Sequence, residues 1–211
     1  MAEVGIPLEY VKWINGFLLN RQARVRLNGE TSGSVQLKQG VPQGCVLSPI
    51  LFLFYINNLA KELEVEDAAA WDLVFSMFAD DVTVVSRDSN RERAVEGAQW
   101  AVDTISTWSE EWKLTLNATK SEVTFFSVWS REAKYTPSIN INGTQIPFNP
   151  NPKLLGVKYD RTLSFEPHVK EITRAATSKL RLLGAVGNSK WGWDKERLVQ
   201  LYYAYVRSKP D

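Results

Sequence analysis

The sequence predicts an α+β fold with a largely antiparallel sheet, followed by a separate, smaller helical segment. Three observations support this prediction. Apolar residues at helical spacing alternate along the chain with arms of alternating polarity. These arms meet at short turns rich in Asn, Asp and Gly, which favours hairpins. Beyond about residue 164 only helical spacing remains. Helices that alternate with hairpins are typical of the α+β class.

The composition predicts a globular chain without a membrane segment or a disulfide. Of 211 residues, 44% are apolar, which suits one large domain or two small ones. Cys45 is the single cysteine, so an intramolecular disulfide and a metal site of several thiolates are excluded, and a reducing compartment is favoured. The longest apolar run, residues 50–56, is far shorter than the roughly 20 residues of a membrane-spanning helix.

The net charge of +1 conceals two segments of opposite sign. Residues 1–152 carry 13 basic and 18 acidic side chains, whereas residues 153–211 carry 12 basic and 6 acidic ones. A strongly basic whole, the simplest indication of nucleic-acid binding, is therefore excluded. The basic C-terminal segment is compatible with a nucleic-acid partner, and equally with solvated helices.

The chain begins with a predicted helix and hairpin. Residues 8–20 place apolar side chains three and four positions apart, which predicts an amphipathic helix. Residues 23–37 alternate around Asn28-Gly29 and Ser32-Gly33, which predicts a hairpin whose loop is longer than the minimal turn. Two glycines and a proline in residues 38–44 predict a loop with special backbone geometry.

A buried helix and a second hairpin are predicted next. Ser48 is placed to cap a helix that has Pro49 in its first turn and runs through Leu63. This helix is apolar enough to be buried around most of its circumference. Two apolar arms around Ala79-Asp80-Asp81 then predict strands joined by a tight turn within residues 71–86.

The rest of the chain is predicted to hold one long helix, short strands and two C-terminal helices. The spacing of residues 91–112 predicts an amphipathic helix lying on the sheet. Short strands are expected at residues 122–127 and 138–141, and a turn is expected at Asp160-Arg161. Ser164 is then expected to cap a long helix, and a last helix is expected over residues 194–206.

Adjacent carboxylates at the apex of an apolar hairpin are the sharpest chemical feature. Asp80 and Asp81 repel each other, and a turn needs at most one of them; an Asx-type turn is the commoner explanation of such a pair. The alternative is a divalent-cation site, because Mg²⁺ is typically held by one or two carboxylates together with substrate phosphates. Neighbouring strand residues point to opposite faces, so one carboxylate is expected to reach the metal and the other to assist. A two-metal site for nucleotidyl transfer needs a further carboxylate from elsewhere.

The loop Gln39–Gly44 is the second chemical feature. Gly40 and Gly44 lack side chains, so the backbone there can approach a base pair or a sugar closely. Gln43 offers both hydrogen-bond donors and acceptors. A loop of this kind before a helix is also explained by structure alone, and both explanations stay open.

These features, taken in order along the chain, resemble the reverse transcriptases of non-LTR retrotransposons. The resemblance rests on four segments: QGVPQGCVLSPILFLFYINNL (39–59), FADD (78–81), LNATKSE (116–122) and KLLGVKYD (153–160). It extends to the opening GIPLEYVKWINGFLLNRQ and the trailing FEPHVKEI, and so covers nearly the whole chain. The combination is highly specific, although no single segment is.

The resemblance implies a polymerase palm, with an antiparallel sheet and packed helices, followed by a small helical thumb. Residues 1–164 would be partial fingers and palm, and residues 165–211 an incomplete thumb. The implied partners are an RNA template, a DNA primer or duplex, deoxynucleoside triphosphates and, in cis, the rest of a retroelement polyprotein. The implied cofactor is Mg²⁺ or Mn²⁺, and an active element would act in the nucleus.

The resemblance also implies residue roles. Asp80 would be the catalytic metal ligand and Asp81 its companion. Pro42, Gln43 and Gly44 would contact the incoming nucleotide or the template. Lys120 would lie near the triphosphate as a proton donor to the leaving pyrophosphate, and Leu155 and Gly156 would support the primer end. The basic excess of the C-terminal segment lies where a thumb would meet phosphates.

The chain departs from the family pattern at its start. The family has an earlier strand with another metal-binding aspartate, and residues 1–12 contain no aspartate. The chain is therefore expected to be an N-terminally truncated fragment of a polymerase. The alternative is a catalytically inactive, nucleic-acid-binding remnant, and a third interpretation is an unrelated metal-dependent phosphotransferase or a globular scaffold.

Three other features are given structural interpretations. His168 is the single histidine and no cysteine cluster accompanies it, so a zinc role is not predicted. Trp108 and Trp112 are expected in the core, whereas one ring of Trp191 and Trp193 has a base-stacking alternative. Arg21, Arg24 and Arg26 are expected along a solvated hairpin edge, with template phosphates as the alternative.

Overall fold

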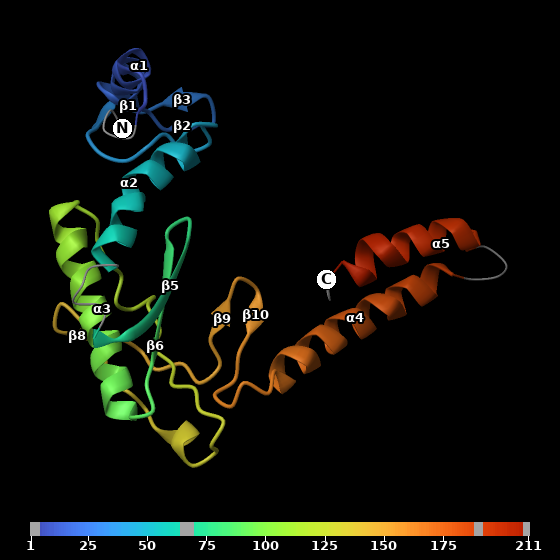
Figure 1. Ribbon diagram of the computed structural model, residues 1–211. Coiled ribbons are helices and arrows are strands. Elements are labelled where there is room, and N and C mark those ends of the chain that lie inside the picture. The colour runs from blue at the N-terminus through green and yellow to red at the C-terminus, as the bar shows by residue number, and fades with distance from the viewer. Residues whose placement is uncertain (1–4, 64–69, 188–191, 209–211) are drawn as a thin grey trace. The chain divides into compact units, whose positions relative to one another are not determined.

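The computed structural model describes residues 5–63, 70–187 and 192–208 (Figure 1). The chain divides into two compact units, Met1–Leu114 and Thr115–Asp211. Helices alternate with short hairpins, and every named strand of the described residues pairs in the antiparallel sense. The predicted α+β class is thereby confirmed. Across the described residues no helix is both long and apolar enough to cross a bilayer.

The first unit opens with helix α1 (Leu8–Leu18) and two nested strand pairs. Strand β1 (Arg21–Ala23) pairs with β4 (Val35–Leu37), and inside them β2 (Arg26–Leu27) pairs with β3 (Glu30–Thr31). The prediction of a longer loop is wrong. Leu27 lies opposite Glu30, so the turn is the minimal two-residue one, because Asn28 and Gly29 both adopt the left-handed conformation, with φ of 49° and 88°.

Helix α2 (Ser48–Leu63) differs from its prediction in two ways. It is buried on one side only: Leu59 is fully buried, but Leu53 is 55% exposed and Phe54 43% exposed. The apolar sequence therefore predicted the helix correctly, but it did not show which side of the helix is buried by neighbouring elements. Ser48 also does not cap by accepting a backbone N–H; its hydroxyl donates to the Pro42 carbonyl instead.

A hairpin and a long helix complete the first unit. Strands β5 (Asp72–Phe78) and β6 (Asp81–Arg87) pair over their whole length, as predicted. Helix α3 (Arg91–Glu111) packs against them and against α2. Its N-cap Asn90 accepts from the Arg93 N–H at 3.1 Å. Buried side chains line one side of the helix, among them Ala101, Ile105 and Trp108, which confirms the predicted amphipathic packing and the core position of Trp108.

The second unit contains short hairpins followed by helices. A 3₁₀ turn, η3 (Glu132–Lys134), precedes the two-residue strand pairs β7 (Asn140–Ile141) with β8 (Thr144–Gln145) and β9 (Lys153–Leu154) with β10 (Val157–Lys158). The predicted strand at residues 122–127 is wrong. Only Val123 makes a bridge there, to Phe148, because the neighbouring backbone groups bond to loops instead of a ladder.

Helix α4 (Glu166–Val186), helix α5 (Lys195–Leu201) and a π-helical turn η4 (Tyr202–Arg207) form the C-terminal part of this unit. Asp194 caps α5 by accepting from the Arg197 N–H at 2.9 Å. The N-cap position of α4 is Phe165 and not Ser164 as predicted, although the Ser164 hydroxyl does accept a hydrogen bond from the N–H of Glu166, the first residue of the helix, at 3.3 Å. Trp191 lies outside the described residues, and Trp193 is half exposed.

Candidate active site

The tip of the β5–β6 hairpin carries the two adjacent aspartates. Phe78 lies directly opposite Asp81, so Ala79 and Asp80 are the two loop residues of a tight hairpin turn. Ala79 has a φ of 54°, whereas Asp80 is not in the left-handed region. A positive φ at the first loop residue is the sign pattern of a type II′ turn, which suits the twist of a hairpin but normally selects Gly at that position. The turn therefore holds strain directly beside the carboxylates.

The two faces of this hairpin have different surroundings. On one face Leu73, Phe75 and Met77 alternate with exposed residues and are partly covered, in line with the packing of α3 on the hairpin. The opposite face contains Val74, exposed by 46%, and Phe78, exposed by 62%. Asp81 pairs with Phe78 and therefore lies on this second, uncovered face. The hairpin thus presents an open surface that ends in a carboxylate.

Both carboxylates are available for an external cation. Asp80 and Asp81 are exposed, and within the described part of the chain neither accepts a hydrogen bond or forms an ion pair. Two adjacent, unpaired carboxylates are a suitable partial donor set for Mg²⁺ or Mn²⁺, which complete their shell with water and phosphate oxygens. Over the described residues, no group of three or more His, Cys, Asp or Glu side chains could hold a metal by itself.

The loop before α2 is fixed at both of its ends. Gly40 and Gly44 have φ of 78° and 77°, which a side chain would strain, and neither has an atom within 4 Å of the position a Cβ would take. Ser48 holds the carbonyl of Pro42, and Cys45 accepts from the Ser48 N–H at 3.1 Å. Between these anchors Gln43 is exposed.

Arg21 holds the other end of the loop, and this contact was missed from the sequence. Its guanidinium donates to the carbonyls of Leu18 at 2.9 Å and Gln39 at 3.3 Å, and also to that of Gly40. Arg21 therefore stabilises the loop through these hydrogen bonds, and the prediction that it lies on a solvated edge is wrong. An arginine followed 18 residues later by a Gly-rich loop gives no local signal of such a contact.

Lys120 lies in a turn organised by Asn117. The Asn117 side-chain oxygen accepts from the Lys120 N–H at 3.1 Å and from the Thr119 hydroxyl at 2.8 Å. The Asn117 carbonyl accepts from the Ser121 N–H at 2.9 Å. The Lys120 side chain is exposed. Asparagine favours Asx turns, in which its side chain bonds to residues two and three positions later in the chain. This preference is the sequence signal that could have identified Asn117.

Leu155 and Gly156 form the two-residue turn of the β9–β10 hairpin. Their φ values of 47° and 92° match the type I′ turn, as do those of Asn28-Gly29 and Asn142-Gly143. The first position of such a turn favours Asn, whose side chain tolerates the left-handed region. Here it holds a leucine that is 60% exposed. A leucine at this position is therefore unfavourable for its backbone conformation.

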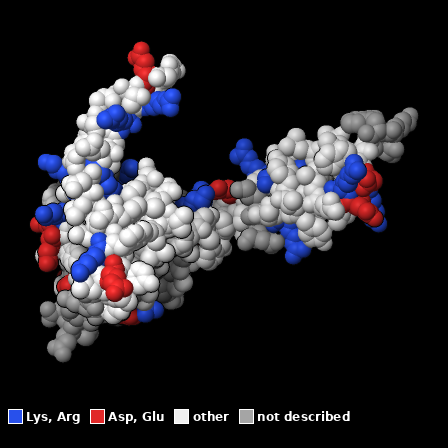
Figure 2. Space-filling model, turned by 90° about the horizontal axis from the view of Figure 1, so that it is seen from above, with Lys and Arg blue, Asp and Glu red and all other residues white. Residues whose placement is uncertain are grey.

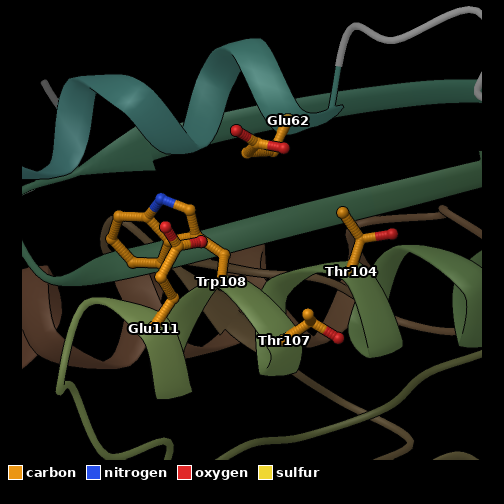
Figure 3. A pocket seen from close by; sticks show the side chains of 5 residues that line it. All are labelled: Glu62, Thr104, Thr107, Trp108 and Glu111. Atoms are coloured by element: carbon orange, nitrogen blue, oxygen red, sulfur yellow. The ribbon is translucent and has the colours of Figure 1, made fainter.

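The predicted site residues fall into both compact units. Pro42, Gln43, Gly44, Asp80 and Asp81 belong to the first, whereas Lys120, Leu155 and Gly156 belong to the second. The first unit also has a hollow of about 210 Å³ between α2 and α3 (Figure 3). It is lined by Glu62, Thr104, Thr107, Trp108 and Glu111. None of these is a predicted site residue, so this hollow is separate from the predicted chemistry.

Basic side chains of α4 have two different environments. Lys170, Arg174 and Arg181 recur at spacings of four and seven residues and are exposed on one face of the helix. Glu166 pairs with Lys170 at 2.5 Å, but Arg174 and Arg181 have no acidic partner within the described residues. Lys179 instead donates to the Tyr205 carbonyl at 2.6 Å and lies over its ring. Figure 2 shows charged side chains of both signs on the α4–α5 part of the surface.

Comparisons with known proteins agree with the resemblance. Residues 1–159 match the family described as reverse transcriptase (RNA-dependent DNA polymerase). The chain is 29% identical over 168 residues to the RNA-directed DNA polymerase from mobile element jockey of Drosophila melanogaster, covering 79% of this chain and 18% of that protein. It is 27% identical over 194 residues to the jockey polymerase of Drosophila funebris, covering 92% and 21%.

A third relative is the probable RNA-directed DNA polymerase from transposon X-element of Drosophila melanogaster. It is 29% identical over 176 residues, which cover 83% of this chain and 19% of that protein. The chain therefore spans about a fifth of the length of the curated relatives it matches. The predicted relationship to the reverse transcriptases of non-LTR retrotransposons is confirmed by these matches.

Proposed function

This chain belongs to the reverse transcriptase family, and from that membership we propose that it supplies the catalytic hairpin and duplex-holding segments of an RNA-directed DNA polymerase. The observation that carries the proposal is the β5–β6 tip, where Asp80 and Asp81 are exposed and unpaired within the described residues. The other face of the hairpin is packed by α3. A rigid hairpin with available carboxylates suits metal-dependent nucleotidyl transfer.

The proposed reaction joins a primer to a deoxynucleoside triphosphate. The primer 3′-hydroxyl oxygen bonds to the α-phosphorus and its proton passes to water, while the bond from that phosphorus to the oxygen bridging to the β-phosphate breaks and pyrophosphate leaves. Asp80 would hold Mg²⁺ or Mn²⁺, and Asp81 would assist from the uncovered face. Such a cation would stabilise the negative charge that develops on the reacting phosphate. The Lys120 ammonium donates a proton to the leaving pyrophosphate.

The loop Pro42–Gly44 is proposed to contact the incoming nucleotide or the template base. Its anchors at Arg21 and Ser48 fix the backbone on both sides of Gln43, so that the exposed Gln43 side chain extends from a fixed backbone position. The open space beside Gly44 leaves room for a sugar or a base pair near the backbone.

Residues 165–211 are proposed as the thumb, and Leu155 and Gly156 as the support of the primer end. Arg174 and Arg181 lie seven residues apart on one helix face, about 10 Å along the axis, and would follow the phosphates of one strand. Replacing both by Gln is expected to weaken binding to an RNA–DNA duplex and to reduce the salt dependence by roughly two counterions. Arg131→Gln, an exposed arginine outside residues 165–211 with no proposed contact to nucleic acid, is the control.

The test is primer extension on an RNA template by a chimera. This chain replaces the segment of the Drosophila melanogaster jockey polymerase with which it aligns, so that the remaining parts of a polymerase are present. Extension that requires a divalent cation and that Asp80→Asn abolishes supports the proposal. A chimera that folds and binds duplex but does not extend, with Asp80 or Asn at this position, contradicts it and favours an inactive nucleic-acid-binding remnant.

A further inference from the structure

The segment between the β9–β10 hairpin and helix α4 is built around one buried carboxylate. Asp160 is 9% exposed and is the only buried charged side chain among the described residues. One of its oxygens accepts from the Thr162 and Ser164 backbone N–H groups, both at 3.2 Å, and from their hydroxyls at 2.6 and 3.1 Å. The other accepts from the Phe165 N–H at 2.7 Å.

These bonds hold a strained turn. Leu163 and Phe165 have φ of 54° and 57°, a conformation that bulky side chains rarely adopt. Two such residues within three positions persist only where the surroundings fix them. The Asp160 carboxylate provides that fixation, because it bonds directly to the N–H of Phe165, the residue from which α4 starts.

Three further contacts join the first turns of α4 to the hairpin. The His168 imidazole accepts from the Lys158 N–H at 3.3 Å through Nδ1. The Lys158 ammonium lies 3.7 Å from a Glu171 carboxylate oxygen. The rings of Tyr159 and Phe165 lie 5.4 Å apart. These contacts fix the orientation of α4 relative to strand β10.

We infer that Asp160 is a positioning residue that fixes helix α4 relative to the β9–β10 hairpin, so that the Leu155 tip and the basic face of α4 move as one body. The contacts of Asp160, Lys158 and His168 are sufficient to make the junction rigid. Its consequence, that the primer end and the duplex backbone are held in a fixed relation, rests on the proposed function. A helix attached without Asp160 would present the same charges in variable directions.

Asp160→Asn is the sharpest variant. If the amide oxygen keeps the position of the oxygen with four donors, the NH₂ group faces the Phe165 N–H, and two donors oppose each other. The bond that starts α4 is then lost while the size of the side chain is retained. Asp194→Asn is the matched control, since Asp194 also caps a helix of this unit, through one exposed backbone bond.

The distance between spin labels on Lys153 of β9 and Ser178 of α4 tests the inference in the 211-residue chain. Both positions are exposed, and Cys45→Ser removes the single native thiol. We expect a narrow distance distribution that Asp160→Asn broadens about twofold or more, because charge-assisted bonds are lost, and that Asp194→Asn leaves unchanged. An unchanged width in a folded Asp160→Asn variant overturns the inference.

Two milder variants keep the test decisive if Asp160→Asn does not fold. Thr162→Val and Ser164→Ala each remove one hydroxyl donor and leave the carboxylate in place. Broadening in both supports the inference, and none in either overturns it. Duplex affinity is measured on the same samples. Broadened distances with unchanged affinity support the positioning role of Asp160 while contradicting the proposed thumb function, so the two failures are distinguishable.

Discussion

The tip of the β5–β6 hairpin and the junction before α4 use aspartate in opposite ways. At the tip, Asp80 and Asp81 are exposed and accept no hydrogen bond within the described residues, beside a strained alanine. At the junction, Asp160 is buried and accepts five hydrogen bonds beside two strained residues. A buried carboxylate whose charge is satisfied by hydrogen bonds can hold a strained backbone in place. An exposed carboxylate without such partners is free to bind a ligand. The partners of a carboxylate, and not its identity, separate the two roles.

The largest expected effect is the loss of polymerase activity in Asp80→Asn. Because the carboxylate has no partner in the described chain, its removal should leave the free energy of unfolding within about 0.5 kcal/mol. Primer extension by the jockey chimera should fall by at least about 10³-fold, since the proposed metal ligand is lost. A variant that unfolds more easily than the parent would show that the tip is structural and would remove the contrast with Asp160.

The second effect is the destabilisation of the chain by Asp160→Asn. Loss of the Phe165 bond and of the charge on four further bonds should lower the free energy of unfolding by about 2 kcal/mol. Urea unfolding followed by circular dichroism measures it, with Asp80→Asn as the exposed control. Equal stabilities for the two variants would contradict the comparison.

The pH dependence of stability separates the charge of Asp160 from its shape. Burial raises the pKa of this carboxyl, but the hydrogen bonds from Thr162, Ser164 and Phe165 outweigh it and lower the pKa from 3.8 to about 2. A depressed pKa in the folded state means that the ionised form stabilises the fold above about pH 4 and that this contribution is lost as the pH falls toward 2. The difference in unfolding free energy between the parent and Asp160→Asn should therefore shrink over that interval. A difference that stays constant from pH 5 to pH 2 would contradict a role for the charge.

Local patterns predicted the elements of both regions, and contacts between distant residues decided what those patterns left open. The β5–β6 hairpin and helix α3 were predicted because alternation and helical spacing are local. The one-sided exposure of α2 was not, since periodicity identifies an apolar helix but not its neighbours. Arg21 was misinterpreted because its acceptors lie 18 and 19 residues away.

The candidate site and its surroundings also contain both residues that the sequence predicted and residues whose role only the structure revealed. Asp80 and Asp81 were predicted from a short motif, and the turn at Leu155 was implied by the family resemblance. Asp160 was read only as part of a turn, since five bonds converging on one carboxylate depend on a left-handed backbone at Leu163 and Phe165 that neither side chain favours. Sequence patterns report what a residue prefers, and they miss positions where the surroundings impose the opposite.

A smaller effect is expected at the Leu155 turn. Leu155→Asn places the preferred residue at a left-handed position and should raise the free energy of unfolding by about 0.5–1 kcal/mol. The reverse exchange at an equivalent turn, Asn28→Leu, should lower it by a similar amount. Primer extension by the Leu155→Asn chimera should nevertheless fall, because the exposed side chain proposed to support the primer is gone. A stabilised variant with full extension would show that Leu155 contacts nothing in the reaction.

The smallest expected effect is at Ala79, the strained residue of the β5–β6 turn. Ala79→Gly relieves the positive φ of 54°, and the extra freedom of glycine in the unfolded chain offsets part of the gain, so that about 0.5 kcal/mol of stabilisation should remain. The same exchange in a helix, Ala185→Gly in α4, should destabilise by up to about 1 kcal/mol, because there alanine is preferred. Thermal unfolding of the two variants gives the two signs directly. If Ala79→Gly destabilises the chain as Ala185→Gly does, the turn is not strained. The carboxylates beside it would then be held by an ordinary turn, and the contrast with the Asp160 junction would reduce to charge alone.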